Sequence, residues 1–276
     1  GRGLTPRATR PSVPVDLAGN PKNYDSLVTK HLPEGVPRVP LLVLAGGSST
    51  RMARTTQNKL KLPVRSEPLL AYLLAAAHGA SVRNIHLATT QATHHDVSET
   101  ARIWRNEFET IECHLQPPLG TFRALTELWR MCGSPRTHFL SAGDLILESM
   151  HLELLLQAWD SRPTSQLAVF AISRRLNAGH TGVAVEENMI VQIGKSLASS
   201  EHCWPGLRIQ SDTYIRAGQH LSDAQRDTEV ASAIAQRLPG ALGACIMEGI
   251  VDINTEADLP IAESLAPHLP WRFPAK

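Results

Sequence analysis

The sequence lacks the features that mark membrane, secreted or broadly nucleic-acid-binding proteins. No uninterrupted apolar run reaches the roughly 18 residues that a membrane-spanning helix needs, and no charged-then-apolar leader begins the chain. The net charge is only +1, from 27 Lys and Arg against 26 Asp and Glu. Broad nucleic-acid binding needs a basic excess, so neither a nucleic acid nor a membrane is expected as a partner. Together these absences predict a cytoplasmic protein.

Cysteine is also scarce, and no C-x-x-C pair is present. The even number of four cysteines would allow two disulfides, but their wide spacing favours ordinary thiols in a cytosolic enzyme. The composition, with 42% hydrophobic and 19% charged residues, is typical of a globular protein. A chain of 276 residues is long enough to bury a core without disulfide or metal staples.

Prolines set the N-terminal part of the chain apart. Residues 1–38 contain Pro6, Pro11, Pro14, Pro21, Pro33 and Pro37 and show little apolar periodicity, which predicts an extended or flexible arm. From Val39 onward, short apolar runs alternate with helical segments. We expect strands over 39–45, 85–89 and 138–142, and helices over 69–78, 98–108 and 121–131. This alternation predicts an α/β fold with a mostly parallel sheet.

The pattern changes in the second half of the chain. Strands are expected over 167–172, 182–185 and 189–193, the last two joined by a hairpin at Glu186-Glu187-Asn188. A helix over 228–236, a strand over 244–248 and a closing helix over 256–265 follow. The pair His94-His95 lacks the H-E-x-x-H spacing of a metal site and is interpreted as part of a solvated loop before the helix at Ser98.

A glycine loop follows the first strand, in the stretch Leu44-Ala45-Gly46-Gly47-Ser48-Ser49-Thr50-Arg51-Met52. Two glycines let the backbone approach a ligand closely and turn successive N–H groups into one concavity. The guanidinium of Arg51 suits phosphate oxygens. The order of residues fits neither G-x-G-x-x-G nor G-x-x-x-x-G-K-[ST], so a Rossmann dinucleotide site or a Walker loop is not supported. The alternative is an ordinary strand-to-helix turn with a surface arginine.

This stretch resembles the signature loop of the nucleotidyltransferases with a glycosyltransferase-A-like fold. That group includes sugar-1-phosphate nucleotidyltransferases, molybdenum-cofactor guanylyltransferases and cytidylyltransferases of alcohol phosphates. The family loop is followed by a lysine in a P-K-P-L-L-P-V-like segment, and 58–64 matches it, with Asn58 and Leu60 at positions where prolines are common. The interval from Arg51 to Lys59 lies between those of the sugar and molybdenum-cofactor enzymes, which leaves the subfamily open.

The resemblance implies a Rossmann-like three-layer α/β/α fold with a mixed, mostly parallel central sheet. It also implies that residues 39–276 form one nucleotidyltransferase domain. Within it, 39–150 would be the nucleotide-binding half and 151–276 the acceptor-binding half.

A second match is the segment Gln116-Pro117-Pro118-Leu119-Gly120-Thr121, which resembles the family's P-L-G-T motif. The resemblance implies that Gly120 lies close to the base and that Gln116 reads its edge. A glycine would admit a flat ring where a side chain would clash. The plainer interpretation is a Pro-Pro turn with Thr121 capping the next helix, and both can hold together.

Two aspartates match the family's metal-binding positions. Asp144 follows Gly143 at the end of an apolar strand, where ligands of α/β proteins bind, and carboxylate oxygens suit Mg²⁺. The segment 251–259 resembles the late D-x-x-T-P-E-D-L motif and implies that Asp252 is the second metal ligand, with Asn254 as an alternative. Thr255 is expected to N-cap the final helix, with Asp258 in a capping-box position.

The hairpin that begins at Gly182 and ends near Lys195 resembles the acceptor-binding hairpin of sugar nucleotidyltransferases. The resemblance implies that Lys195 holds the acceptor phosphate and that Gly182 belongs to the same subsite. Gly194 occupies the position where a glutamate usually contacts sugar hydroxyls. This departure leaves the acceptor open among a sugar, a cyclitol and a smaller phosphorylated alcohol.

The activity implied is transfer of NMP from an NTP to a phosphorylated acceptor, preferably a sugar- or cyclitol-1-phosphate, with release of pyrophosphate. Arg51 and Lys59 would be catalytic, and Mg²⁺ would be the cofactor. The implied nucleotide-binding residues are Ala45, Gly46, Gly47, Ser48, Arg51, Lys59, Gln116, Gly120 and Thr121. Alternatives are a cytidylyl- or guanylyltransferase for a non-sugar alcohol phosphate and a non-catalytic nucleotide-binding homologue. Family members often form dimers or tetramers, so a homo-oligomer is compatible with the resemblance.

Overall fold

A computed structural model describes residues 39–47, 58–174, 180–197, 200–221 and 225–267. All of them belong to one compact unit that runs from Arg38 to Lys276. The arm expected over 1–38 lies outside the described residues. None of the helices in the described ranges is long and apolar enough to cross a membrane.

The centre of this unit is a mixed ten-stranded sheet with the strand order β11-β9-β10-β13-β8-β12-β6-β1-β4-β5. Strands β6, β1, β4 and β5 are parallel to one another, and β12 pairs antiparallel with both β6 and β8. In chain order the strands are β1 (Leu41–Leu44), β4 (Asn84–Thr89), β5 (Thr110–Leu115), β6 (Thr137–Ala142), β8 (Ala168–Arg174), β9 (Thr181–Glu186), β10 (Met189–Gly194), β11 (His202–Trp204), β12 (Arg208–Ser211) and β13 (Leu242–Ile246).

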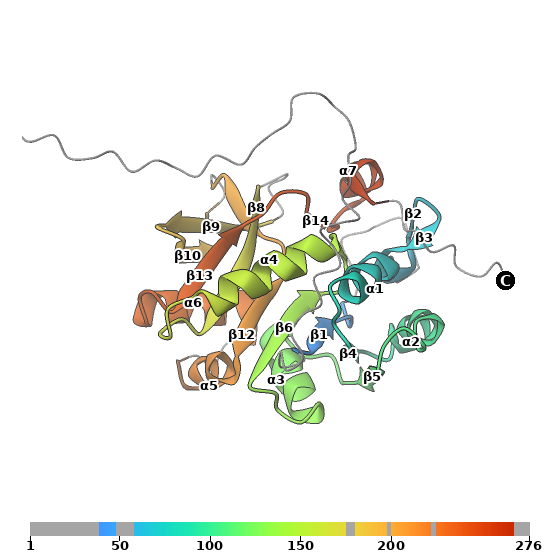
Figure 1. The fold of residues 1–276 in the computed structure, drawn as a ribbon, viewed down its shortest axis with the longest axis horizontal. Helices are drawn as coiled ribbons and strands as arrows, with labels where there is room; N and C mark the ends of the chain where they lie inside the picture. Colours follow the sequence, from blue (N-terminus) through green and yellow to red (C-terminus); the bar gives the residue numbers. More distant parts are fainter. Residues whose placement is uncertain (1–38, 48–57, 175–179, 198–199, 222–224, 268–276) are drawn as a thin grey trace, which may run out of the picture. The chain divides into compact units, whose positions relative to one another are not determined.

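Helices cover both faces of this sheet, which confirms the expected α/β architecture. One face packs against α1 (Leu69–Gly79), α2 (His94–Ile103) and α4 (Ser149–Asp160). The other packs against α3 (Thr121–Met131), α5 (Asp212–Leu221) and α6 (Asp227–Arg237). Helices α1 and α4 lie side by side across the sheet (Figure 1). The result is the predicted three-layer arrangement.

Strand β1 shows why the first apolar run lies at the centre of the fold. Successive side chains of a strand point to opposite faces. Leu41 and Val43 therefore join the core beneath α1, α2 and α4, whereas Leu42 joins the core beneath α3, α5 and α6. All three are fully buried. A strand covered on both faces needs a continuous apolar sequence, which is the pattern of this run.

Small two-stranded pairings lie beside the main sheet. β2 (Pro63–Val64) pairs with β3 (Glu67–Pro68), and β7 (Leu145–Ile146) pairs antiparallel with β14 (Val251–Asp252). The hairpin between β9 and β10 is confirmed, and its turn residues Glu187 and Asn188 both have positive φ. The four cysteines are free, as expected.

The predicted start of α2 is wrong. The helix begins at His94 rather than Ser98 and ends at Ile103 rather than Phe108. The chain turns immediately after β4, where the His94 N–H donates to the Thr90 carbonyl at 2.8 Å, so only a tight turn over 90–93 separates the strand from the helix. The pair His94-His95 consequently lies in the first helical turn.

Several elements were not recognised from the sequence, among them β5, β12, α4 and α5. Strand β12 was missed for a physical reason. It carries the charged residue Arg208, which is fully buried. The Arg208 guanidinium forms a two-bond ion pair with Asp227 at the start of α6, and the bond to Asp227 Oδ1 measures 2.9 Å. A charged residue interrupts the apolar pattern by which a buried strand is recognised. The counter-charge that permits its burial lies in a distant part of the sequence.

The C-terminal segment follows the predicted capping pattern. A short 3-10 helix η3 (Glu256–Asp258) leads into α7 (Leu259–Leu265), in place of one continuous helix. Thr255 is the N-cap residue of η3 and forms a capping box with Asp258. The predicted capping box of Thr255 and Asp258 is present, but Thr255 caps η3 rather than the final helix α7, whose N-cap residue is Asp258.

Candidate active site

Asp144 and Asp252 are brought together by the β7–β14 pairing. Asp144 directly precedes β7, and Asp252 in β14 pairs with Leu145. The N–H of Ile253 donates to the Asp144 carbonyl at 3.2 Å, which continues the pairing by one bond. Asp144 follows β6 at the carboxyl end of that strand. Both predicted metal-binding carboxylates therefore lie at the carboxyl ends of the strands, where α/β proteins bind ligands.

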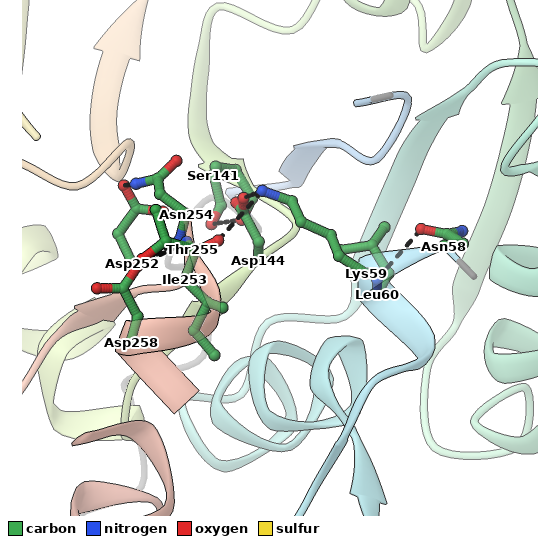
Figure 2. Close-up of polar contacts among 11 residues, drawn as sticks. Asn58, Lys59, Leu60, Ser141, Asp144, Asp252, Ile253, Asn254, Thr255 and Asp258 are labelled. Atoms are coloured by element: carbon green, nitrogen blue, oxygen red, sulfur yellow. Dashed lines mark hydrogen bonds and ion pairs between the residues drawn. The ribbon is translucent and has the colours of Figure 1, made fainter. Parts of the chain in front are cut away.

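Lys59 joins this pair from a third segment of the chain. Its ammonium is bonded to the Asp144 carboxylate and donates to the Ile253 carbonyl at 3.2 Å (Figure 2). The Lys59 and Asp144 side chains are only 14% and 12% exposed, so their ion pair is largely shielded from solvent. The structure therefore brings together the predicted residues Lys59, Asp144 and Asp252.

Lys59 owes its position to a single 3-10 turn, η2 (Lys59–Lys61). The Asn58 side chain caps this turn by accepting from the Leu60 N–H at 3.1 Å. Leu60 is buried in the core and anchors the turn. The supporting roles of Asn58 and Leu60 were not predicted, since the sequence only marked them as departures from family prolines.

The Asp144 carboxylate lies close enough to Asp252 for the two negative charges to repel each other. Burial raises the pKa of Asp252 well above its ordinary value, and the Asp144 carboxylate raises it further. Lys59 and the amide of Asn254, which donates to Asp252 Oδ2, act in the opposite direction. A second cation beside the carboxylates would relieve the repulsion, and hard divalent cations prefer such oxygen donors. The residues present thus fit a Mg²⁺ ion.

Asp258 holds the loop that carries Asp252 and Asn254. Its Oδ2 accepts hydrogen bonds from the Asn254 N–H at 2.9 Å, the Thr255 N–H at 2.7 Å and the Thr255 hydroxyl at 3.0 Å. Asp258 is buried, and Figure 2 shows it beneath the loop, on the side away from Lys59. The capping box predicted from the sequence therefore also positions the carboxylate site.

The glycine loop begins at the same edge of the sheet. The Gly143 N–H donates to the Leu44 carbonyl at 3.1 Å, which places the last residue of β1 beside the start of the Asp144 segment. A Cβ at Gly46 would lie 3.0 Å from the Thr90 methyl group, whereas a Cβ at Gly47 would meet nothing within 4 Å. Ser48 and Arg51 lie outside the described residues.

The Gln116–Thr121 segment contacts Gln225, which lies just before α6, and the first residue of that helix. A Cβ at Gly120 would lie 2.4 Å from the Gln225 carbonyl oxygen, so packing alone requires glycine there. Gly120 is the N-cap residue of α3, and the expectation that Thr121 caps this helix is wrong. The Thr121 hydroxyl instead accepts from the N–H of Asp227 in α6 at 2.8 Å.

Gln116 is buried, and its side-chain nitrogen donates to the Ala124 carbonyl at 3.3 Å. It borders a hollow of about 330 Å³. The hollow is lined by Leu115, Gln116, Pro117, Leu119, Arg123, Glu127 and Met131.

The predicted acceptor residues lie in the β9–β10 hairpin. Gly182 pairs with Gly194 across the hairpin, and a Cβ at Gly182 would lie 2.4 Å from the Leu197 carbonyl oxygen. Lys195 is exposed in the turn after β10. Among the hydrogen bonds and ion pairs between described residues, none joins Lys195 to Asp144 or Asp252.

Comparisons with known proteins identify the family and the fold of this chain. The model of the MobA-like NTP transferase domain family matches residues 41–217. A protein from Bacillus anthracis, described as a glucose-1-phosphate thymidylyltransferase and solved with a sucrose, superposes with a TM-score of 0.71 at 18% identity, over 86% of this chain and 98% of its own. The inositol-1-phosphate CTP transferase from T. maritima gives 0.69 at 17% identity, over 83% and 95%. At these identities the two structures establish the fold. No curated protein sequence gives a significant match.

Proposed function

The chain belongs to the family of MobA-like NTP transferase domains, and from this premise we propose that it transfers a nucleoside monophosphate from an NTP to a phosphorylated acceptor. The observation that supports this most directly is the convergence of Lys59, Asp144 and Asp252 from three distant segments at the ligand-binding edge of the sheet. A non-catalytic homologue would have no need of this shielded arrangement of opposite charges.

The proposed reaction exchanges one phosphorus–oxygen bond for another. An oxygen of the acceptor phosphate forms a bond to the α-phosphorus of the NTP. The bond from that phosphorus to the bridging oxygen breaks, and pyrophosphate leaves with the electron pair. Both reactants are anions, so the protein's task is alignment and charge neutralisation rather than nucleophilic attack by a side chain.

Different residues of the chain would align the two reactants and neutralise their charge. The backbone of Ala45, Gly46 and Gly47, with Ser48 and Arg51, would hold the NTP phosphates. Lys59 would neutralise charge on the transferred phosphoryl group, because its ammonium already lies beside the two carboxylates. Gln116, Gly120 and Thr121 would form the base side of the site, and Gly182 and Lys195 the acceptor side.

Asp144 and Asp252 would hold Mg²⁺, with Asn254 orienting Asp252 through its amide. Such an ion supplies positive charge at the α-phosphate when it is bound. Asp258 acts through the loop that it anchors, since its three hydrogen bonds fix the backbone on which Asp252 and Asn254 are mounted.

A sugar- or cyclitol-1-phosphate is the acceptor that we propose. The two solved structures of the same fold are described as acting on glucose-1-phosphate and inositol-1-phosphate. A second candidate is a polyol or amino-alcohol phosphate. It is favoured by Gly194, which supplies no carboxylate for sugar hydroxyls.

The test is a matrix of the common NTPs against glucose-1-phosphate, inositol-1-phosphate and glycerol phosphate, with Mg²⁺ and a pyrophosphate readout. We expect pyrophosphate only when an NTP is combined with a sugar or cyclitol phosphate. If pyrophosphate is released only when the acceptor is glycerol phosphate, the second candidate is favoured. If no combination releases pyrophosphate from a folded protein, the proposed transfer reaction is wrong.

A further inference from the structure

Three potential metal ligands meet at the free edge of the sheet, away from the aspartate cluster. His86 lies on β4, and Glu112 and His114 lie on the neighbouring edge strand β5. The parallel register places His86 opposite Glu112. Glu112 and His114 are two residues apart on one strand, so their side chains point to the same face. Strand register alone therefore gathers the three side chains.

The ligand atoms of this cluster form a compact triangle. His86 Nδ1 lies 3.1 Å from His114 Nε2, and each of these nitrogens lies 3.6 Å from Glu112 Oε2. In tetrahedral zinc sites, bonds of about 2.0–2.1 Å place neighbouring ligand atoms about 3.3 Å apart. The observed triangle thus has the size of one face of such a tetrahedron.

A simple hydrogen bond between two neutral imidazoles accounts for only part of this arrangement. It explains the short separation of the two nitrogens, but it does not require that both also face one carboxylate oxygen. At 3.6 Å these nitrogens are too far from Glu112 Oε2 to form hydrogen bonds with it. A single ion within the triangle would be in reach of all three groups at once.

The surroundings suit a transition metal better than Mg²⁺. Both imidazoles are only 12% exposed, whereas the Glu112 side chain is 58% exposed, which leaves a route from solvent. Burial lowers the pKa of both His86 and His114, which keeps them in the neutral form that binds metals. Imidazole nitrogens suit zinc and related ions, whereas Mg²⁺ prefers oxygen ligands.

We propose that His86, Glu112 and His114 form a second metal site, selective for Zn²⁺ and separate from Asp144 and Asp252. The three side chains leave a fourth position for water or another ligand. The ion links β5 to β4, its one neighbour among the described strands, and so stabilises the edge of the sheet just before Gln116.

The experiment uses the full chain without a polyhistidine tag, stripped with a chelator and dialysed. Zn²⁺ is titrated in competition with a chromophoric chelator, and Co²⁺ is added separately as a spectroscopic probe. We expect one Zn²⁺ bound per chain, a tetrahedral Co²⁺ visible spectrum, a higher Tm with Zn²⁺, and no displacement by excess Mg²⁺. Absence of the Co²⁺ spectrum together with no uptake of Zn²⁺ would refute the site.

Variants at the site, compared with matched controls elsewhere in the chain, localise the bound zinc. Glu112→Gln and His114→Gln should each weaken Zn²⁺ binding by at least about tenfold, since losses of that order already follow loss of outer-shell partners. The matched controls Glu153→Gln on α4 and His220→Gln on α5 change exposed residues of the same types and should bind like wild type. Zinc binding unchanged in Glu112→Gln, whose side chain is largely exposed and tolerates the change, would contradict the proposal even if His114→Gln does not fold.

Discussion

The ammonium of Lys59 is paired with the carboxylate of Asp144, 85 positions away in the chain. The same ammonium is bonded to the carbonyl of Ile253, next to Asp252. One lysine thus links the turn after the glycine loop, the end of β6 and the late β14 segment. Two carboxylates at one edge of a sheet repel each other, and this lysine offsets part of that repulsion.

Lys59→Gln removes the positive charge proposed to act on the transferred phosphoryl group. We expect kcat for pyrophosphate release to fall by about 10²–10³, the range found when one preorganised electrostatic group is removed. Lys61→Gln is the matched control from the same 3-10 turn, since Lys61 pairs with Asp96 at 2.9 Å and Glu99 at 3.2 Å. Equal loss of activity in the two variants would mean that lysine at 59 acts only on the local fold.

Asp144→Asn removes one of the two carboxylates proposed to hold Mg²⁺. We expect pyrophosphate release to fall by at least about 100-fold, because the charge at the α-phosphate is no longer neutralised. The circular dichroism spectrum should stay unchanged. Asp160→Asn, at the exposed end of α4, is the control and should keep full activity. Full activity in Asp144→Asn would remove this residue from the site.

Asp227→Ala leaves the fully buried Arg208 guanidinium without its counter-charge. We expect the free energy of unfolding to fall by about 3–5 kcal/mol, the cost of breaking one partner of a buried pair. Urea denaturation measures this change. Arg216→Ala breaks the exposed pair with Asp212 and should cost no more than about 1 kcal/mol. A similarly small loss for Asp227→Ala would show that water reaches Arg208.

Because His138 is buried, we expect the folded protein to lose stability in acid. Burial, followed by the charge of Arg208, lowers the pKa of His138 to about 3. The folded protein therefore keeps this ring neutral, while the unfolded chain takes up a proton below a pH of about 6.5. Stability from this residue is present above that pH and is lost as the pH falls toward 3, by about 1.4 kcal/mol per pH unit.

The measurement is the free energy of unfolding at pH values between 7 and 4. His138→Asn should flatten this dependence by about one proton, whereas His220→Asn, an exposed residue of α5, should leave the slope unchanged. Identical slopes for wild type and His138→Asn would contradict a neutral buried histidine.

Local patterns were enough to predict much of the framework. The apolar run over Leu41–Leu44 alternates between two buried faces, and α3 begins and ends at the residues that its periodicity indicates. Gly143-Asp144 at a strand end and the Thr255–Asp258 capping box were also readable, because each depends on residues close together in the chain.

Elements that are stabilised by residues distant in the chain could not be predicted from local sequence patterns. Strand β12 contains Arg208, whose burial is tolerable only because Asp227 neutralises it. The start of α2 depends on a turn formed by threonines after β4, which periodicity does not reveal. The His86–Glu112–His114 cluster depends on the pairing of β4 with β5, and β5 is too polar to be recognised as a strand.

The α/β alternation, the glycine loop and the charged residues of the candidate site could be predicted from the order of amino acids alone. Those features follow from propensity and periodicity, which act over a few neighbouring residues. The contacts of Lys59 with Asp144 and Ile253, and the close approach of the Gln225 backbone that requires glycine at position 120, became evident only in the folded structure. Such contacts depend on strand order and register, which the packing of the whole core selects.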